Sequence, residues 1–210
     1  MALIAEVKKA SPSRGVIRDD FDPVAIARAY ESAGAHALSV LTDVEYFQGS
    51  VENLQKSRSS TRLPVLRKDF TVTEAQVYET RAIGADAILL IVNGLSHSEL
   101  QDLYGLSSAL GLDVLVEAHT AEEAESALGL GAALVGINNR NLKTFDEDLS
   151  VSCELIPTIA HRATIVSESS IRNAAEVSKV AQAGARAVLI GTSFCAAPDP
   201  GAKVLSLIHI

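Results

Sequence analysis

One pattern occurs five times along the 210-residue sequence: a helix-like stretch ends in a glycine, and a short apolar run follows within a few residues. The five glycines are Gly34, Gly84, Gly111, Gly131 and Gly184. A glycine just past a helix relieves the left-handed conformation in which many helices end. A short apolar run is typical of a parallel strand buried on both faces. Repeated units of this kind predict an α/β fold with its site at the carboxyl ends of the strands.

The apolar runs and the stretches between them predict eight strands in strict alternation with helices. The expected strands are residues 2–8, 37–41, 64–67, 87–92, 114–117, 134–137, 164–167 and 187–190. The expected helices begin at Asp22-Pro23 and continue with residues 51–59, 73–83, 96–110, 121–128, 149–156 and 173–183; residues 198–210 resemble a last helix that is cut short. Eight similar units without an obvious edge strand favour closure over a doubly wound open sheet. We therefore expect a single (β/α)8 TIM barrel over residues 1–210.

Composition and charge exclude several classes of protein. A formal net charge of −8, without clusters of basic residues among aromatic ones, argues against a nucleic-acid partner. No apolar run reaches the roughly 18 residues of a membrane span, and the first ten residues lack the order of a signal peptide. Cys153 and Cys195 match no metal or redox spacing, so we expect free thiols, no metal and a cytoplasmic location.

Polar residues stand where the predicted strands end. They are Glu6, Lys8, Lys68, Glu117, Asn138, Glu168, Gly191 and Thr192. Because the ends of parallel strands meet at one mouth, we expect these residues to surround one site. So many charges would be costly to desolvate without a function or partners. The alternative is a solvated rim of charges that pair with one another.

Lys68 and Glu117 are the expected acid and base. Surrounded by other cations and apolar walls, Lys68 would have a lowered pKa and could act as a general acid near neutral pH. The alternative for Lys68 is an ordinary charge at a strand exit. For Glu117, the alternative is a purely structural salt bridge to a lysine. Such a salt bridge would have the same geometry as the catalytic pair of Lys68 and Glu117.

Two short hydroxyl-rich turns predict a phosphate site. Many barrels bind phosphate at the loops after the seventh and eighth strands, through backbone N–H groups. Here those loops contain residues 167–170 and 191–193. Serine and threonine are also common helix caps, so each turn alone is weak support for a phosphate site. The prediction rests on the presence of such a turn in both of the expected loops.

The histidines do not form a metal site. We expect surface or packing roles for His36, His97, His161 and His209, whereas His119 follows Glu117 at the same rim. No zinc-type histidine motif, glycine-rich dinucleotide turn or Walker loop is present in the sequence. The sequence therefore predicts no cofactor.

Eight segments carry a resemblance to a known family. They are IAEVKKASPS at 4–13, LSVLT at 38–42, YFQG at 46–49, PVLRKDF at 64–70, VEAH at 116–119, GINNRNL at 136–142, SES at 167–169 and LIGT at 189–192. In order and spacing, from the first strand to the eighth, they resemble the indole-3-glycerol-phosphate synthase family of tryptophan biosynthesis. The resemblance implies ring closure of 1-(2-carboxyphenylamino)-1-deoxyribulose 5-phosphate with loss of CO2 and water, without a cofactor.

The resemblance also implies roles for individual residues. Lys68 would be the general acid at the ribulose carbonyl, and Glu117 would assist the later dehydration. Lys8 would hold the substrate carboxylate or phosphate, and Asn138 would hydrogen-bond a substrate hydroxyl. Glu6 and Glu168 would orient the lysine side chains and the hydroxyl groups of the site.

Binding residues follow from the same resemblance. The expected substrate and phosphate ligands are Ser11, Arg140, Ser169, Ser170, Gly191 and Thr192. The expected anthranilate pocket consists of Pro12, Phe47, Leu66, Phe70 and Leu89. The expected partner is a small phosphorylated substrate, and we expect a monomer that associates with other enzymes of the tryptophan pathway.

The sequence departs from the family pattern at three points. The N-terminal segment that covers the barrel mouth in the family is missing, the last helix is short, and Ser170 stands where the family has glycine. An alternative is therefore a phosphate-binding barrel fragment with little or no activity. Another is a sister barrel such as phosphoribosylanthranilate isomerase, which would need a Cys/Asp pair where this chain has Lys8, Glu117 and Asn138.

Overall fold

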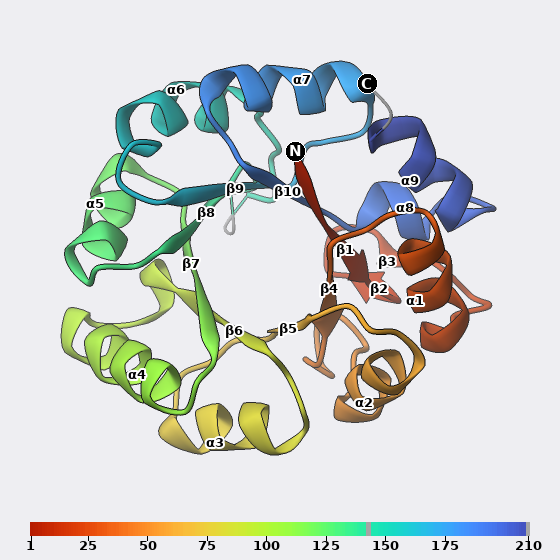
Figure 1. Ribbon diagram of the computed structural model, residues 1–210, viewed down its shortest axis with the longest axis horizontal. Helices are drawn as coiled ribbons and strands as arrows, with labels where there is room; N and C mark the ends of the chain where they lie inside the picture. Colours follow the sequence, from red (N-terminus) through yellow and green to blue (C-terminus); the bar gives the residue numbers. More distant parts are fainter. Residues whose placement is uncertain (142–143, 209–210) are drawn as a thin grey trace.

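The strands form a closed barrel inside a ring of helices (Figure 1). The computed structural model describes residues 1–141 and 144–208. Leu142, Lys143, His209 and Ile210 lie outside these ranges, and so do the expectations for His209 and for the end of the last helix.

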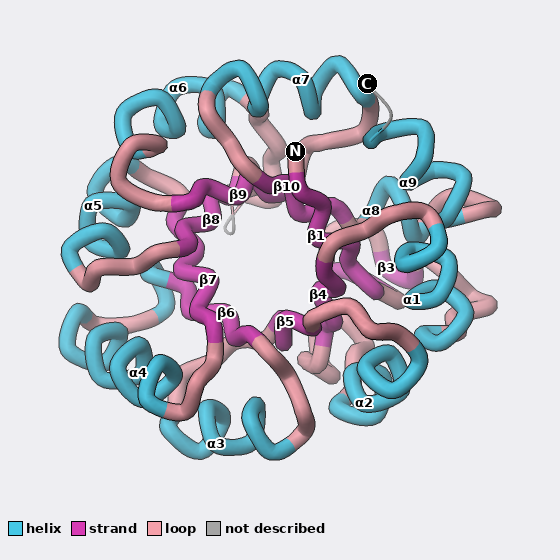
Figure 2. Tube along the Cα trace, in the orientation of Figure 1, coloured by secondary structure: helices cyan, strands magenta, loops and turns pink. Residues whose placement is uncertain are grey.

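Eight parallel strands make the barrel, as predicted (Figure 2). They are β1 (Ala2–Val7), β4 (Ala37–Leu41), β5 (Val65–Lys68), β6 (Ala87–Ile91), β7 (Asp113–Ala118), β8 (Leu134–Asn138), β9 (Thr164–Glu168) and β10 (Ala187–Ile190). Each strand pairs with its neighbours in sequence order, and β1 closes the ring by pairing with both β4 and β10. The fold is therefore a single (β/α)8 barrel.

Helices follow the strands along the chain and pack outside them (Figure 1). They are α1 (Pro23–Ser32), α2 (Val51–Ser60), α3 (Glu74–Ala82), α4 (His97–Ala109), α5 (Ala121–Gly129), α6 (Ser150–Ile159), α7 (Ala174–Ala183) and α9 (Pro200–Ile208). Polar side chains cap the first turns of several helices. Asp22 accepts hydrogen bonds from the N–H groups of Val24 and Ala25, and Thr73 and Ser96 form reciprocal capping boxes.

The glycine joints confirm the pattern that first suggested the fold. Gly34, Gly84, Gly111, Gly131 and Gly184 have φ values of 91°, 88°, 72°, 77° and 113°. All five lie in the left-handed region, which glycine adopts without the steric penalty of a Cβ atom. Each joint ends a helix and turns the chain into the next strand.

Four local features differ from the sequence-based prediction. A small antiparallel pair, β2 (Ala10–Ser11) and β3 (Gly15–Val16), lies between the first expected strand, which ends at residue 8, and the first expected helix, where the sequence predicts no further strand. Helix α6 continues past Pro157 because the extra turn buries Ile159 in the core. The segment after β10 forms two helices, the short α8 (Thr192–Cys195) and then α9, and a 3-10 turn η1 (Val92–Gly94) follows β6.

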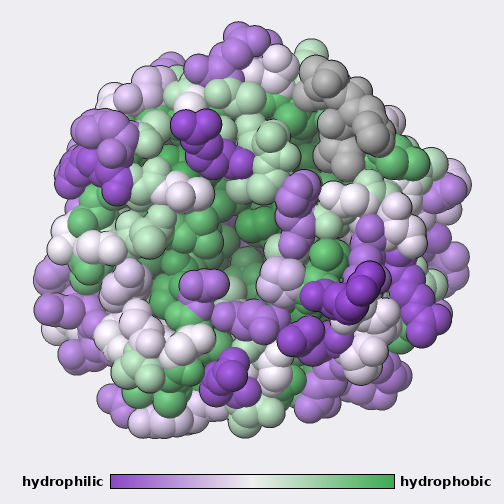
Figure 3. All heavy atoms as spheres, viewed as in Figure 1, coloured by the Kyte–Doolittle hydropathy of each residue, from purple (hydrophilic) through white to green (hydrophobic). Residues whose placement is uncertain are grey.

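The hydrophobic core has two parts. The larger part fills the space between strands and helices, where the side chains are mainly aliphatic. The smaller part fills the barrel interior and consists of Leu66, Leu89, Leu115, Val166, Ala187 and Leu189. Apolar residues gather around the barrel axis and hydrophilic ones lie mostly at the periphery (Figure 3). No helix within the described ranges 1–141 and 144–208 is long and apolar enough to cross a membrane.

Candidate active site

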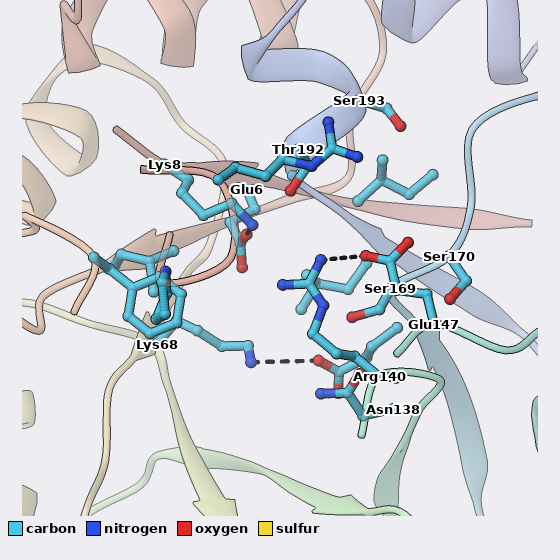
Figure 4. A pocket seen from close by; sticks show the side chains of 18 of the residues that line it. Glu6, Lys8, Lys68, Asn138, Arg140, Glu147, Ser169, Ser170, Thr192 and Ser193 are labelled. Carbon is cyan, nitrogen blue, oxygen red and sulfur yellow. Dashed lines mark hydrogen bonds and ion pairs between the residues drawn. The ribbon is translucent and has the colours of Figure 1, made fainter. Parts of the chain in front are cut away.

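A pocket of about 520 Å³ lies at the carboxyl ends of the strands (Figure 4). The polar residues predicted from the strand ends all line it: Glu6, Lys8, Lys68, Glu117, Asn138, Glu168, Gly191 and Thr192. Strand register accounts for this, since Lys68 pairs with Leu41, Glu117 with Ile91 and Asn138 with Glu168 near the ends of their strands. The barrel therefore brings residues separated by up to 186 positions to one mouth, from Glu6 to Thr192.

Most of the expected binding residues also line this pocket. They are Pro12, Phe47, Phe70, Leu89, Arg140, Ser169 and Ser170. Ser11 and Leu66 are not among the lining residues. Ser11 is buried just before Pro12, and Leu66 packs in the interior core with Leu89.

Lys68 lies at the centre of a group of carboxylates. Its Nζ donates a hydrogen bond to Oε2 of Glu117 at 2.9 Å and lies 3.5 Å from Oε2 of Glu168. Burial alone would lower the pKa of Lys68, but the negative charges of Glu117, Glu168 and Glu6 raise it well above its ordinary value. The expected lowering of this pKa is therefore wrong, because carboxylates rather than cations surround the ammonium group.

Glu117 and Glu168 differ in protonation although both are buried. Burial favours the neutral form of Glu117, but Lys68 and His119, together with a hydrogen bond from Asn138 at 3.0 Å, lower its pKa. Burial raises the pKa of Glu168 to about 8, and the charge of Lys68 only partly opposes this. The site thus combines an ionised and a protonated carboxyl group, an arrangement suited to acid–base chemistry.

A second lysine–glutamate pair lies at the end of β1. Nζ of Lys8 lies 2.6 Å from Oε1 of Glu6, and both side chains are buried. Burial would raise the pKa of Glu6, but Lys8 and then Lys68 lower it. Glu6 is therefore ionised, and its contact with Nζ holds the side chain of Lys8 at the pocket wall.

Two glycines make room for the buried carboxylates. A Cβ atom at Gly136 would collide with Oε1 of Glu168, and one at Gly191 would collide with Oε1 of Glu6. Both glycines lie beside strand ends, in β8 and directly after β10. Only a residue without a side chain leaves Glu6 and Glu168 in their present positions.

The turn after β9 is strained. Ser169 and Ser170 have φ values of 63° and 60°, in the region that favours glycine. Oγ of Ser170 has no hydrogen-bond partner among the described residues, and the serine lies at the pocket. The departure from the family pattern at Ser170 therefore falls at a position whose backbone conformation suits glycine.

Basic residues gather near this turn. Arg140 binds the carboxylate of Glu147 (Figure 4). A nitrogen of the Arg172 guanidinium lies 2.6 Å from the other oxygen of the same carboxylate. Nζ of Lys203 donates to the carbonyl oxygen of Arg172 at 3.1 Å. With two arginines and one lysine against one glutamate, this end of the pocket has an excess of positive charge, which suits a phosphate group.

Aromatic rings form the opposite wall. Phe70 lies between Tyr46 and Phe47, with ring centroids 6.1 Å and 6.2 Å apart. Sequence reasoning missed Tyr46, Glu147 and Arg172 as lining residues, because all three lie in loops without periodic signal. Tyr46 opens the segment YFQG at residues 46–49, and its position directly before Phe47 is the signal that could have found it.

The fold and site define a (β/α)8 barrel with ionisable residues at the strand ends and a positively charged end opposite an aromatic wall. The sequence model of the family described as "Indole-3-glycerol phosphate synthase" matches residues 1–207. The chain therefore belongs to the indole-3-glycerol phosphate synthase family, which comprises lyases that decarboxylate their substrate in tryptophan and aromatic amino-acid biosynthesis.

Similar curated proteins agree with this assignment. An indole-3-glycerol phosphate synthase from Azoarcus sp. (strain BH72) is 52% identical over 208 residues, covering 98% of this chain and 79% of that protein. One from Polynucleobacter necessarius subsp. necessarius (strain STIR1) is 50% identical over 206 residues, covering 98% of this chain and 77% of that protein. This membership decides against the isomerase family considered from the sequence.

Solved structures support the fold alone. A 3-hexulose-6-phosphate synthase has a TM-score of 0.74 at 16% identity, covering 99% of this chain and 98% of that chain. An N-acetylmannosamine-6-phosphate 2-epimerase from Clostridium perfringens has a TM-score of 0.74 at 19% identity, covering 91% of this chain and 86% of that chain.

Proposed function

We propose that this chain converts 1-(2-carboxyphenylamino)-1-deoxyribulose 5-phosphate into indole-3-glycerol phosphate, CO2 and water. One observation carries the proposal: the Lys68 ammonium lies between Glu117 and Glu168, inside a pocket with a cationic end and an aromatic wall. A substrate with a phosphate at one end and an aromatic ring at the other matches both ends of this pocket.

Lys68 acts as the general acid in the first step. The aromatic carbon that bears the carboxylate attacks the ketone carbon, and Lys68 donates a proton to the ketone oxygen as the carbon–carbon bond forms. The carboxylate leaves as CO2, and its electron pair restores the aromatic ring. The raised pKa keeps Lys68 protonated at neutral pH, which is the form that a proton donor requires.

Dehydration completes the indole ring. The new hydroxyl group leaves as water after it takes a second proton, and the ionised carboxylate of Glu117 removes one proton from the five-membered ring. Two protons enter the substrate and one leaves it, so each turnover consumes one proton from the solvent. Neither an oxidant nor a cofactor takes part in these steps.

The remaining residues bind and orient the substrate. Lys8, held by Glu6, contacts the substrate carboxylate or phosphate, and Asn138 hydrogen-bonds a hydroxyl group while it orients Glu117. The phosphate is bound by Arg140, Ser169, Ser170, Gly191 and Thr192, and the anthranilate ring lies against Pro12, Phe47, Phe70 and Leu89. Ser11 and Leu66 support these surfaces from buried positions next to Pro12 and Leu89.

We further propose a cytoplasmic monomer, and association with other enzymes of the tryptophan pathway stays a prediction. Product fluorescence tests the activity itself: soluble folded protein should form indole-3-glycerol phosphate from the substrate. The alternative is a phosphate-binding barrel with little or no activity. Calorimetry with a non-reactive substrate analogue distinguishes them, since tight binding without turnover would support the alternative and contradict the proposed reaction.

A further inference from the structure

A row of three side chains leads from the catalytic centre toward the surface. Nε2 of His119 lies 3.5 Å from Oε1 of Glu117, and Nδ1 lies 3.2 Å from Oε2 of Glu123. The exposed fraction of the side chains rises along the row, from 1% for Glu117 through 11% for His119 to 18% for Glu123. His119 lies behind Glu117 and is not among the residues that line the pocket.

Glu123 holds the histidine from the outer side. It lies in the first turn of α5, where the helix dipole favours a negative charge. Its Oε2 accepts a hydrogen bond from the backbone N–H of His119 at 2.7 Å, while Thr120 caps the N–H of Glu123 at 3.2 Å. The backbone N–H of His119 therefore anchors the carboxylate, the Thr120 cap holds the backbone of Glu123, and the carboxylate fixes the orientation of the imidazole ring.

The neighbours of the ring determine where its protons lie. An ionised carboxylate only accepts hydrogen bonds, so the nitrogen facing Glu123 must carry a proton. In the neutral ring that leaves the lone pair of Nε2 facing Glu117, and Nε2 has no hydrogen-bond partner among the described residues. Only the imidazolium donates to both carboxylates, which are the two acidic groups within 4 Å of the ring in the described part of the chain.

Glu117 connects this ring to Lys68. Its Oε1 faces His119 and its Oε2 accepts from Lys68 at 2.9 Å, so one buried carboxylate touches both nitrogen groups. The other carboxyl groups near Lys68, those of Glu168 and Glu6, also line the pocket, but neither is among the ion-pair contacts of the ring. A proton that passes from Nε2 to Oε1 therefore reaches Lys68 when the carboxyl group of Glu117 rotates and presents that oxygen to Nζ.

We propose that His119 stores the proton that each turnover consumes and passes it through Glu117 to Lys68 while substrate fills the pocket. The inference rests on the proposed function. After Lys68 has protonated the ketone oxygen, the imidazolium gives its Nε2 proton to Glu117, and Glu117 gives it to Lys68. Lys68 then protonates the leaving hydroxyl, and Glu117, ionised again, takes the proton from the ring.

Protons are balanced over one catalytic cycle. When Glu117 returns its last proton to Lys68, both groups regain their starting states and only His119 has lost a proton. The solvent restores that proton after the product leaves. His119 touches no substrate, so it is a positioning residue that acts through Glu117.

His119→Gln tests the proposal in the full chain. The glutamine amide keeps a donor near Glu117 but carries no transferable proton. We expect kcat to fall at least tenfold and KM to change less than twofold, and the kcat–pH profile should lack one titration. His161→Gln is the matched control, because His161 is exposed, and it should keep the wild-type kcat and profile. Wild-type kcat and an unchanged profile in His119→Gln would overturn the proposal but leave the proposed reaction intact.

A second measurement does not depend on turnover or on a variant that folds. Nitrogen-15 NMR of the wild-type protein reports which ring nitrogen of His119 carries the proton in the neutral form. We expect the proton on Nδ1, facing Glu123. A proton on Nε2 in the neutral ring would overturn the proposal even if the protein is active, because no lone pair would then face Glu117. Absence of turnover in folded wild-type protein would instead contradict the proposed function.

Discussion

The ammonium nitrogen of Lys68 lies 2.9 Å from a carboxylate oxygen of Glu117, so the proposed acid and base contact each other in the free protein. The contact keeps Lys68 protonated and Glu117 ionised, which are the states that ring closure requires. It also means that the ketone oxygen of the substrate must compete with Glu117 for the ammonium group. Several consequences of this arrangement can be measured.

Ser170→Gly should stabilise the protein. Ser170 has a φ of 60°, a conformation that is unfavourable by about 1 kcal/mol for a residue with a side chain. We expect the melting temperature to rise by a few degrees, and the KM for the phosphorylated substrate to fall because the backbone can approach the phosphate more closely. Calorimetry and steady-state kinetics measure both.

Ser98→Gly is the control for this substitution. Ser98 lies in the first turn of the regular helix α4 and is exposed. Glycine there should lower the melting temperature, since it loses more conformational entropy on folding. An unchanged or lowered melting temperature in Ser170→Gly would contradict the inferred backbone strain.

Glu168 should make stability depend on pH. Burial raises its pKa to about 8 in the folded state, whereas an unfolded glutamate has a pKa of about 4.3. Between these values the folded state binds more protons than the unfolded state. The free energy of unfolding should therefore fall as pH rises from about 5 to 8, with a slope of up to about 1.4 kcal/mol per pH unit for one proton.

Glu168→Gln should flatten this dependence, as followed by urea unfolding across the same pH range. Glu154→Gln is the matched control, because Glu154 is exposed on α6, and it should keep the slope of the wild type. If the wild-type protein became more stable between pH 5 and 8, or if Glu168→Gln kept the same slope, the protonated state assigned to Glu168 would be wrong.

Gly136→Ala should damage the site although it replaces no ionisable residue. The added Cβ would collide with Oε1 of Glu168 and force that carboxylate away from Lys68. We expect kcat to fall at least tenfold and the melting temperature to fall as well. Gly105→Ala in α4 is the control, since nothing lies within 4 Å of its Cβ position, and alanine should leave kcat unchanged. Equal kcat values in both variants would contradict the steric role of Gly136.

The fold was predictable because its signals are local. Each of the five glycines marks the end of a helix, because a positive φ angle there favours glycine, and each apolar run marks a buried strand. The prediction was wrong where tertiary packing determines the secondary structure. Burial of Ile159 extends α6 past a proline, and residues 10–16 pair as a small hairpin. Neither effect has a signature within a few residues of sequence.

The site was predictable in its members but not in its electrostatics. Strand ends brought Lys68 and Glu117 together as expected, whereas the direction of the Lys68 pKa shift was wrong. That shift depends on distances to carboxylates on β1, β7 and β9, which no spacing in the sequence reports. Glu147 and Arg172 were missed for the same reason, since only the folded loops bring them to the pocket. The individual catalytic and binding roles stay predictions.

The most direct test of the account is product formation by Lys68→Ala under single-turnover conditions, followed by the fluorescence of indole-3-glycerol phosphate. Loss of the general acid should slow the chemical step by about 10²–10⁴-fold while the protein stays folded. Lys9→Ala is the control, because Lys9 follows Lys8 in the sequence but does not line the pocket, and this variant should react at the wild-type rate. A rate in Lys68→Ala within a few-fold of the wild type would contradict the central role assigned to Lys68.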